Sequence, residues 1–458
     1  MKMLRNSAPE NHIVEGRLGV AGTPKNMRVE ALKLGTTGPE HLYLEAGGTV
    51  KEIEGTYEYE GYIASGASDI SVLRSLFGIK LPPFGTPLFE GQIRGSMKKA
   101  SFEGRVRLGS SRFRTTLSHF LTKQRPRVTA TVLAPTVYLA DVGVYPEFPE
   151  DLSLEIAPEP QSGDRLFSDK PLPFDALKAI DLSVSVAADN VVGKDFVLKN
   201  LNVDMLLKDG KLQIAPATVT YRNGSASIDF TIDTVGSKPE MALKVTAEDV
   251  DIGALSAYLH KAPSLLGQLN LVIALQSSGK SAREMATALK GEFGVAVEKG
   301  KIKQDIELMA QDAVDFLAAM RSSSKYSELR CMALRFVFEK GIGESEIIYL
   351  ETPDMYAVGR AYIDLRTETM RMVLQPKPKK ALPGLTSAVT IEGPIDNPKV
   401  RKLPFQEAAK LYGEIAMPMV FLPARGLGYL WYLIRKDAPG ESPCIGMRPE
   451  NNNLDEAR

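Results

Sequence analysis

Histidine and cysteine, on which most metal sites and many catalytic centres depend, are scarce in this sequence. Only four histidines and two cysteines occur in 458 residues. The histidines are scattered without the short spacings of metal ligands: His12, His41, His119 and His260. The two cysteines form neither a metal-binding nor a redox motif on their own: Cys331 and Cys444. The sequence therefore predicts no metal site and no cofactor.

An excess of charge of either sign is also lacking. Lysine and arginine together number 56, as do aspartate and glutamate, so the formal net charge is zero. Because nucleic acids and anionic surfaces attract proteins that carry a net positive field, this balance excludes a global attraction to either. We expect no nucleic-acid partner, and we expect the actual partners to be recognised by local surfaces.

Motifs for nucleotide chemistry or acid–base catalysis are incomplete. The stretch Ser278–Ser281 resembles the end of a phosphate-binding loop, but Ala274 stands where such a loop needs a glycine. Ser281, with Glu284 three residues later, is better explained as the N-cap of a helix over 282–290. A cluster of carboxylates is more typical of a solvated turn, since no base or nucleophile accompanies it: Glu248, Asp249 and Asp251. The sequence thus predicts a non-enzymatic protein.

A secretory signal is not visible at the start of the chain. Residues 1–17 are polar and lack the apolar centre of a signal peptide. The sequence indicates either a protein that stays inside the cell or part of a longer, membrane-anchored chain.

Strand-like alternation is what the sequence has in abundance. One pattern of two strands and a short reversal, followed by an aspartate and an apolar exit, occurs at 42–76, 102–142 and 226–259. In the third copy three apolar residues alternate with polar ones: Ile228, Phe230 and Ile232. Such strands have one apolar and one polar face. Because a single unit cannot bury its apolar face, the repetition predicts a stacked, elongated β-protein.

The most apolar stretch lies near the end of the chain, at 415–434. It contains Pro418, Pro423 and Arg425, which argue against a simple membrane span. We expect an interfacial segment or a plug over one end of a groove. Three aromatic residues are suited to a membrane interface: Tyr429, Trp431 and Tyr432.

Several stretches resemble, in order, the AsmA family of Gram-negative envelope proteins. They include LFSDKPLPFDALKAIDLSVSV at 166–186, VDIGALSAYL at 250–259 and the segment at 269–302. The resemblance is strongest over 166–400. It implies a periplasm-facing β-groove related to bridge-like lipid-transfer proteins, associated with the inner membrane and connected with outer-membrane biogenesis or phospholipid traffic.

Together these features predict a mainly β protein with a few helices: an elongated, curved antiparallel β-sheet groove built from repeated β-meander units. The expected division is an N-terminal β-repeat region at 1–144, a proline-rich linker at 145–174, a C-terminal β-groove with packed helices at 175–403 and an apolar tail at 404–458. A second helix, over 304–320, is expected to lie on the sheet because its apolar residues recur every three and four positions.

Two uses of the apolar strand faces remain open. The candidate lipid-groove residues are Leu182, Val184, Val203, Leu212, Ile228, Phe230 and Ile232. They could shield acyl chains, gaining about 0.8 kcal/mol per buried methylene, or they could be core packed against the helices. The first reading predicts phospholipid and the inner-membrane surface as partners. The second predicts a scaffold that recruits envelope-assembly proteins.

The resemblance also bears on the cysteines. An oxidising periplasm would allow a disulfide between Cys331 and Cys444, fastening the apolar tail to the last β-unit. Two unpaired thiols are the alternative.

Overall fold

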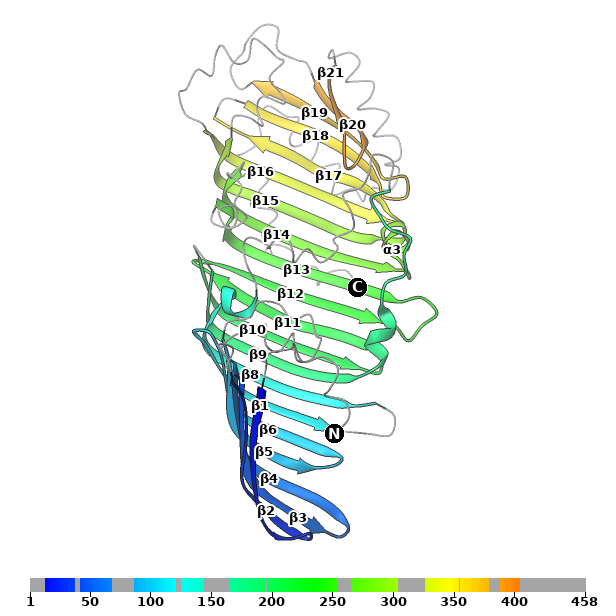
Figure 1. The fold of residues 1–458 in the computed structure, drawn as a ribbon. Coiled ribbons are helices and arrows are strands. Elements are labelled where there is room, and N and C mark those ends of the chain that lie inside the picture. The colour runs from blue at the N-terminus through cyan, green and yellow to red at the C-terminus, as the bar shows by residue number, and fades with distance from the viewer. Residues whose placement is uncertain are drawn as a thin grey trace, which may run out of the picture. The chain divides into compact units, whose positions relative to one another are not determined.

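The fold is described by a computed structural model that covers residues 13–37, 42–67, 86–120, 125–143, 165–193, 196–253, 265–303, 326–353, 355–378 and 388–403. These residues form 21 strands, one α-helix and two short 3-10 helices (Figure 1). The chain divides into two compact units: unit 1 is Met1–Ile156 with Phe174–Thr220, and unit 2 is Ala157–Pro173 with Tyr221–Arg458. The predicted helix over 304–320 and the apolar tail lie outside the described residues.

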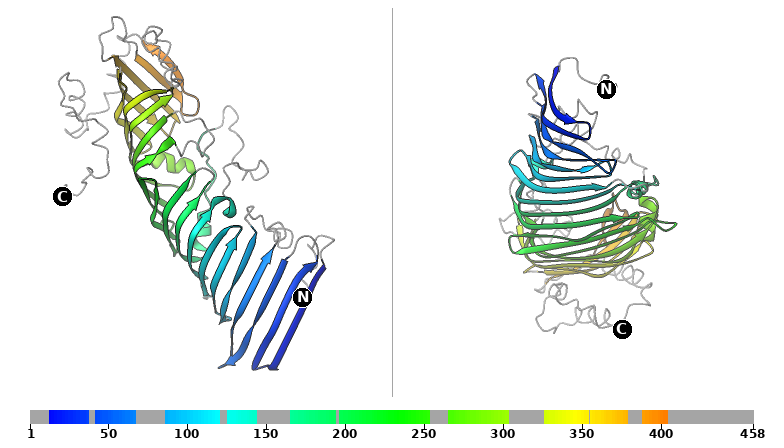
Figure 2. Two further views of the ribbon diagram at one scale, coloured as in Figure 1. Left: turned by 90° about the vertical axis from the view of Figure 1, so that its left-hand side faces the viewer. Right: turned by 90° about the horizontal axis from the view of Figure 1, so that it is seen from below.

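Unit 1 is a meander of long strands. Its strands are β1 (Ile13–Thr23), β2 (Asn26–Thr37), β3 (Leu42–Ile53), β4 (Thr56–Ala67), β5 (Pro87–Ser96), β6 (Lys99–Leu108), β7 (Ser111–Phe120), β8 (Arg127–Tyr138), β9 (Asp181–Val192), β10 (Val197–Lys208) and β11 (Lys211–Tyr221). The last strand, β11, ends at the unit boundary, with its final residue Tyr221 already assigned to unit 2. Each of β1 to β7 pairs antiparallel with the next strand, so β1 to β8 lie side by side in chain order (Figure 2).

One pair of unit 1 departs from the predicted antiparallel pattern. β8 and β9 run parallel, with Val128 opposite Leu182 and Val132 opposite Val186. A parallel pair needs a long connection, and here 42 residues separate the two strands, beginning with the 3-10 helix η1 (Leu139–Val142) and ending after η3 (Phe174–Lys178). After this change of direction, β9, β10 and β11 are again antiparallel.

Unit 2 is also a meander of long strands. Its strands are β12 (Gly224–Asp233), β13 (Glu240–Asp251), β14 (Leu265–Ser278), β15 (Lys290–Lys303), β16 (Tyr326–Glu339), β17 (Ile342–Glu351), β18 (Met355–Asp364), β19 (Thr369–Pro378), β20 (Ala388–Pro394) and β21 (Lys399–Leu403). Every neighbouring pair is antiparallel. The predicted fold class is confirmed: the described residues form a mostly antiparallel, open β-sheet of meander units, consistent with a curved β-groove.

Short turns set the strand register. An aspartate followed by glycine is a strong sequence signal for a two-residue hairpin, and this pair occurs at Asp209–Gly210. There φ is +53° and +80°, the left-handed pair that such a hairpin requires. A further hairpin is formed by β18 and β19, in which Asp364 is opposite Thr369. In its turn, Arg366 donates hydrogen bonds of 2.8 and 2.7 Å to the two carboxylate oxygens of Asp364, and this contact lowers the pKa of that carboxyl below its usual value.

The single α-helix among the described residues is α3 (Ala282–Ala288), which begins where the sequence predicted. The Ser281 hydroxyl accepts a hydrogen bond of 3.2 Å from the Glu284 amide, as a capping residue should. The helix ends earlier than the predicted residue 290: the C-cap is Leu289. Gly291, which as a glycine just after the predicted helix would suit a C-terminal cap, lies inside β15. There φ is +123°, and a Cβ would meet the backbone of Ala274 on β14, so the glycine is needed for a close approach of two strands.

The end of the predicted linker is fastened to unit 2, and we call residues 165–173 the strap. The Leu166 and Phe167 amides donate hydrogen bonds of 2.7 and 3.2 Å to the Glu368 carboxylate in the β18–β19 turn. Arg283 on α3 donates to the same carboxylate at 3.0 Å and to the Phe167 carbonyl at 3.1 Å. The Arg283 and Glu368 side chains are only 15% and 14% exposed, so these charge-assisted bonds are shielded from solvent.

Replacing Glu368 by glutamine is expected to release the strap. The change removes the shared charge and one acceptor oxygen, and hydrogen bonds to charged groups contribute roughly 1.5–3 kcal/mol. Amide hydrogen exchange at Leu166 and Phe167 should accelerate by about tenfold or more. The matched control is Asp175→Asn, which removes an ion pair whose carboxylate is 99% exposed and should leave these rates unchanged. Equal exchange rates in the two variants would show that Glu368 does not hold the strap.

Candidate functional site

Strand register gathers the apolar side chains of unit 1 on one face of its sheet. Residues directly opposite each other on paired strands point to the same side. Starting at Val20 on β1, successive partners can be followed through every strand to Ile214 on β11. The complete row is Val20, Val29, Gly48, Gly61, Ile93, Phe102, Leu117, Ala130, Val184, Met205 and Ile214. Not one member of this row is polar.

The neighbouring row is almost as apolar. It reads Leu18, Leu32, Ala46, Ile63, Gly91, Gly104, Thr115, Val132, Val186, Val203 and Ala217. We call the surface formed by these two rows the unit-1 apolar face. The alternate positions carry mostly polar residues, for example Arg94 opposite Ser101 and Thr129 opposite Ser183. One side of the sheet is therefore apolar across all eleven strands.

Large side chains on the unit-1 apolar face are partly exposed instead of buried. Leu18 is 65% and Val20 is 52% exposed. Phe102, Val184 and Met205 are half-buried. Among the described residues of unit 1, the buried hydrophobic side chains are few and mostly small: Ala67, Ala134, Ala188, Val191 and Leu207. An ordinary core would bury its large aliphatic and aromatic residues, so this face is open to solvent over much of its extent.

Unit 2 has a corresponding face. A row from β12 to β20 carries no polar side chain: Phe230, Leu243, Leu275, Gly291, Phe338, Gly343, Ile363, Met370 and Gly393. The adjacent row begins Ile228, Val245, Ile273, Phe293 and Phe336. We call the surface of these two rows the unit-2 apolar face.

The unit-2 apolar face differs along its length. At β12 to β14 it is open, since Ile228 is 41% exposed and Phe230 is half-buried. Further along, Phe336, Ile348 and Ala361 are no more than 7% exposed and form a packed cluster. A second cluster, around Ala296, Cys331, Ala333 and Tyr349, lies on the opposite face. The strands β15 to β18 therefore contain the densest core of the described residues.

The predicted groove residues all lie on these faces or extend them. Leu182 and Leu212 are both opposite Leu207, next to the row that contains Val184. Val203 lies in the second row of unit 1, opposite Val186. Ile228, Phe230 and Ile232 share one side of β12 in unit 2. None of the seven is buried. Their contact with lipid remains a prediction.

Most of the open surface was not identified from the sequence. In the sequence, Phe102, Val106 and Leu108 alternate with charged residues, a pattern typical of a half-buried strand, and β6 is such a strand. The pattern does not indicate a place in a row that continues through ten other strands. Alternation could have identified each strand's apolar side. The register that joins those sides was not available without the structure.

The predicted disulfide and the predicted membrane-interface residues lie partly or wholly outside the described residues. Cys331 is 1% exposed and carries no free thiol, whereas Cys444 lies outside the described residues, so the predicted pairing stays a prediction. The predicted membrane-interface residues also lie outside them: Tyr429, Trp431 and Tyr432.

Within the described ranges there is no group of three or more histidine, cysteine, aspartate or glutamate side chains placed to hold a metal ion. The same ranges contain no helix with the length and apolarity needed to cross a membrane.

Comparison with known proteins gives one match. The model of the AsmA family matches residues 22–348, which extend from the end of β1 into β17 and include most of both apolar faces. No curated protein and no solved structure matches the chain.

Proposed function

Because the chain belongs to the AsmA family, we propose that it is a non-enzymatic envelope-biogenesis protein that holds phospholipid acyl chains on its apolar faces. In this proposal it faces the periplasm in association with the inner membrane, conducts phospholipid between membranes and so supports outer-membrane assembly. The observation that carries the proposal is the partly exposed row from Val20 to Ile214, which has no polar member.

The dimensions of the unit-1 apolar face suit an acyl chain. Eleven strands separated by about 4.8 Å give rows roughly 48 Å long. This exceeds the roughly 30 Å thickness of a bilayer's hydrocarbon core. Because the row from Val20 to Ile214 has no polar member, an acyl chain could move along it without meeting a polar side chain. Exposed apolar surfaces of this size are unusual on soluble proteins unless something binds to them.

The energetics also favour a lipid tail as the occupant. Each methylene transferred from water gains about 0.8 kcal/mol, and the half-buried side chains would lose their remaining contact with water. The lipid headgroup would stay outside the apolar rows. Binding of this kind requires no catalytic residue, and it accounts for the polar alternate positions, which keep the other side of the sheet hydrated.

A scaffold is the second candidate function. It is favoured by β15 to β18, where both faces bury their side chains, as in the clusters around Phe336 and Ala333. In that case the strands would be ordinary core and the protein would recruit envelope-assembly proteins through its surface.

Photo-crosslinking from two adjacent positions of β10 separates the candidates. Met205 lies in the apolar row, whereas Leu206 points to the polar side and is 45% exposed. With benzoylphenylalanine at position 205, we expect a phospholipid adduct in cells, and at position 206 we expect none. The two positions are matched because both residues are apolar and lie on the same strand. Adducts to protein alone at position 205, or equal lipid labelling at both positions, would contradict lipid binding by this face.

A further inference from the structure

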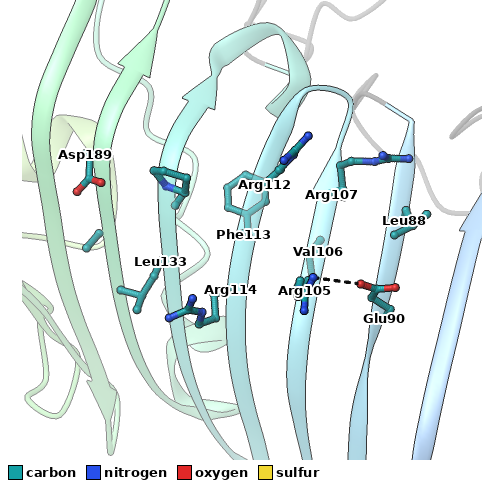
Figure 3. Close-up of a pocket in the computed structure, with 13 residues that line it drawn as sticks. Leu88, Glu90, Arg105, Val106, Arg107, Arg112, Phe113, Arg114, Leu133 and Asp189 are labelled. Atoms are coloured by element: carbon teal, nitrogen blue, oxygen red, sulfur yellow. Dashed lines mark ion pairs between the residues drawn. The ribbon is translucent and has the colours of Figure 1, made fainter.

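A pocket of about 660 Å³ lies on unit 1, and four arginines line it (Figure 3). They come from the β6–β7 hairpin, where Arg105 is opposite Arg114 and Arg107 is opposite Arg112. By strand register all four belong to the polar side of the sheet, opposite the unit-1 apolar face. The other lining residues on that side are Leu88 and Glu90 on β5, Leu133 and Pro135 on β8, and Ala187 and Asp189 on β9.

This arrangement is electrostatically unfavourable without a ligand. Like charges directly opposite each other on paired strands destabilise a sheet, and here two such pairs are consecutive. Arg105 lies 3.9 Å from the Glu90 carboxylate, but among the described residues no ion pair is formed by Arg107, Arg112 or Arg114. The four arginines outnumber the carboxylates of Glu90 and Asp189 by two, so the pocket has two positive charges in excess. The whole chain, by contrast, has a formal net charge of zero.

We propose that the four-arginine pocket binds a phosphate group. The planar guanidinium group can donate two parallel hydrogen bonds to a phosphate, and a dianion placed among Arg105, Arg107, Arg112 and Arg114 would replace their repulsion with attraction. The pocket volume falls within the range of small-molecule sites. Leu88 and Leu133 add apolar lining beside the charges.

Two sources of phosphate would present the same chemistry: a phospholipid headgroup and a free phosphate ion. The site lies on the polar side of the sheet, so it does not depend on acyl-chain binding by the opposite face. A phospholipid bound here would use its headgroup, with the leucines beside the glycerol region.

Calorimetric titration of the full chain at about 0.15 M ionic strength tests the proposal. The two probes are inorganic phosphate and monomeric dihexanoyl phosphatidylglycerol. The test variant is Arg107→Gln with Arg112→Gln, which removes one opposed pair. Affinity should fall by about tenfold or more, since charge-assisted hydrogen bonds are lost. Stability of the ligand-free protein should stay equal or rise, which a merely structural role of the arginines would not produce.

The control removes the same charge elsewhere. Arg94→Gln with Arg127→Gln changes two exposed cations on the polar side of unit 1 that do not line the pocket, and binding should be unchanged. Binding of phosphate alone would assign the site to a soluble phosphate, and binding of the lipid alone, or of both, would assign it to a headgroup. If neither probe binds, or if the test and control variants bind equally, the proposal is overturned.

Discussion

The substitution Ile228→Asp is expected to remove most of the phospholipid that remains bound to the protein during purification. Ile228 is 41% exposed in the open part of the unit-2 apolar face, directly opposite Val245. A carboxylate there would have to lose its water when an acyl chain lies over it, and burying an unpaired charge costs several kcal/mol or more. We expect at least about a tenfold reduction in lipid per mole of protein, measured by extraction and mass spectrometry. Phe230→Asp combined with Ile232→Asp should act in the same way but cost more stability, because those side chains are half-buried.

The control for this experiment lies on the same strand. Thr231 is exposed and points to the polar side of β12, so Thr231→Asp adds the same charge without touching the apolar row. It should retain the lipid content of the unaltered protein. The exposure of Ile228 means that Ile228→Asp should keep its melting temperature within a few degrees. Unchanged lipid in a folded Ile228→Asp protein would contradict binding at this part of the face.

Alanine in place of Gly104 is expected to destabilise unit 1 by about 3 kcal/mol. Gly104 on β6 is directly opposite Gly91 on β5. A Cβ at Gly104 would collide with the Glu90 carbonyl oxygen and lie 2.7 Å from the Gly91 Cα. Both are backbone atoms of the neighbouring strand, so the strands themselves would have to separate. Amide hydrogen exchange in β5 and β6 should therefore become at least about a hundredfold faster.

A glycine with room for a methyl group provides the comparison. At Gly19 on β1, an added Cβ would come no closer than 3.7 Å to any neighbour. Gly19→Ala should be neutral or slightly stabilising, because alanine restricts the unfolded chain. If Gly104→Ala and Gly19→Ala unfold alike, the close approach of β5 and β6 is not a requirement of this sheet.

Local features of this fold could be predicted from the sequence where one residue's own chemistry decides them. The hydroxyl of Ser281 fixes the start of α3, and the left-handed turn at Asp209 and Gly210 fixes the β10–β11 hairpin. The alternation from Phe102 to Leu108 identifies β6 and its apolar side. In each case the signal lies within a few residues.

Features that depend on which strands meet could not be predicted. The parallel pairing of β8 with β9 and the close approach of Gly291 to Ala274 involve residues far apart in the chain. The arginine pocket exists only because register places Arg105 opposite Arg114. Alternation shows which side of a strand is apolar, but not whether anything covers that side. For this reason the candidate groove residues could not be distinguished from ordinary core.

Native mass spectrometry of the full chain, exported to the periplasm of a Gram-negative host by an added signal sequence, tests the central claim most directly. If the apolar faces hold acyl chains, the folded protein should carry bound phospholipid reproducibly, and lipid extraction of the same sample should identify it. Folded protein that is free of lipid in repeated preparations would contradict the claim and would favour the scaffold.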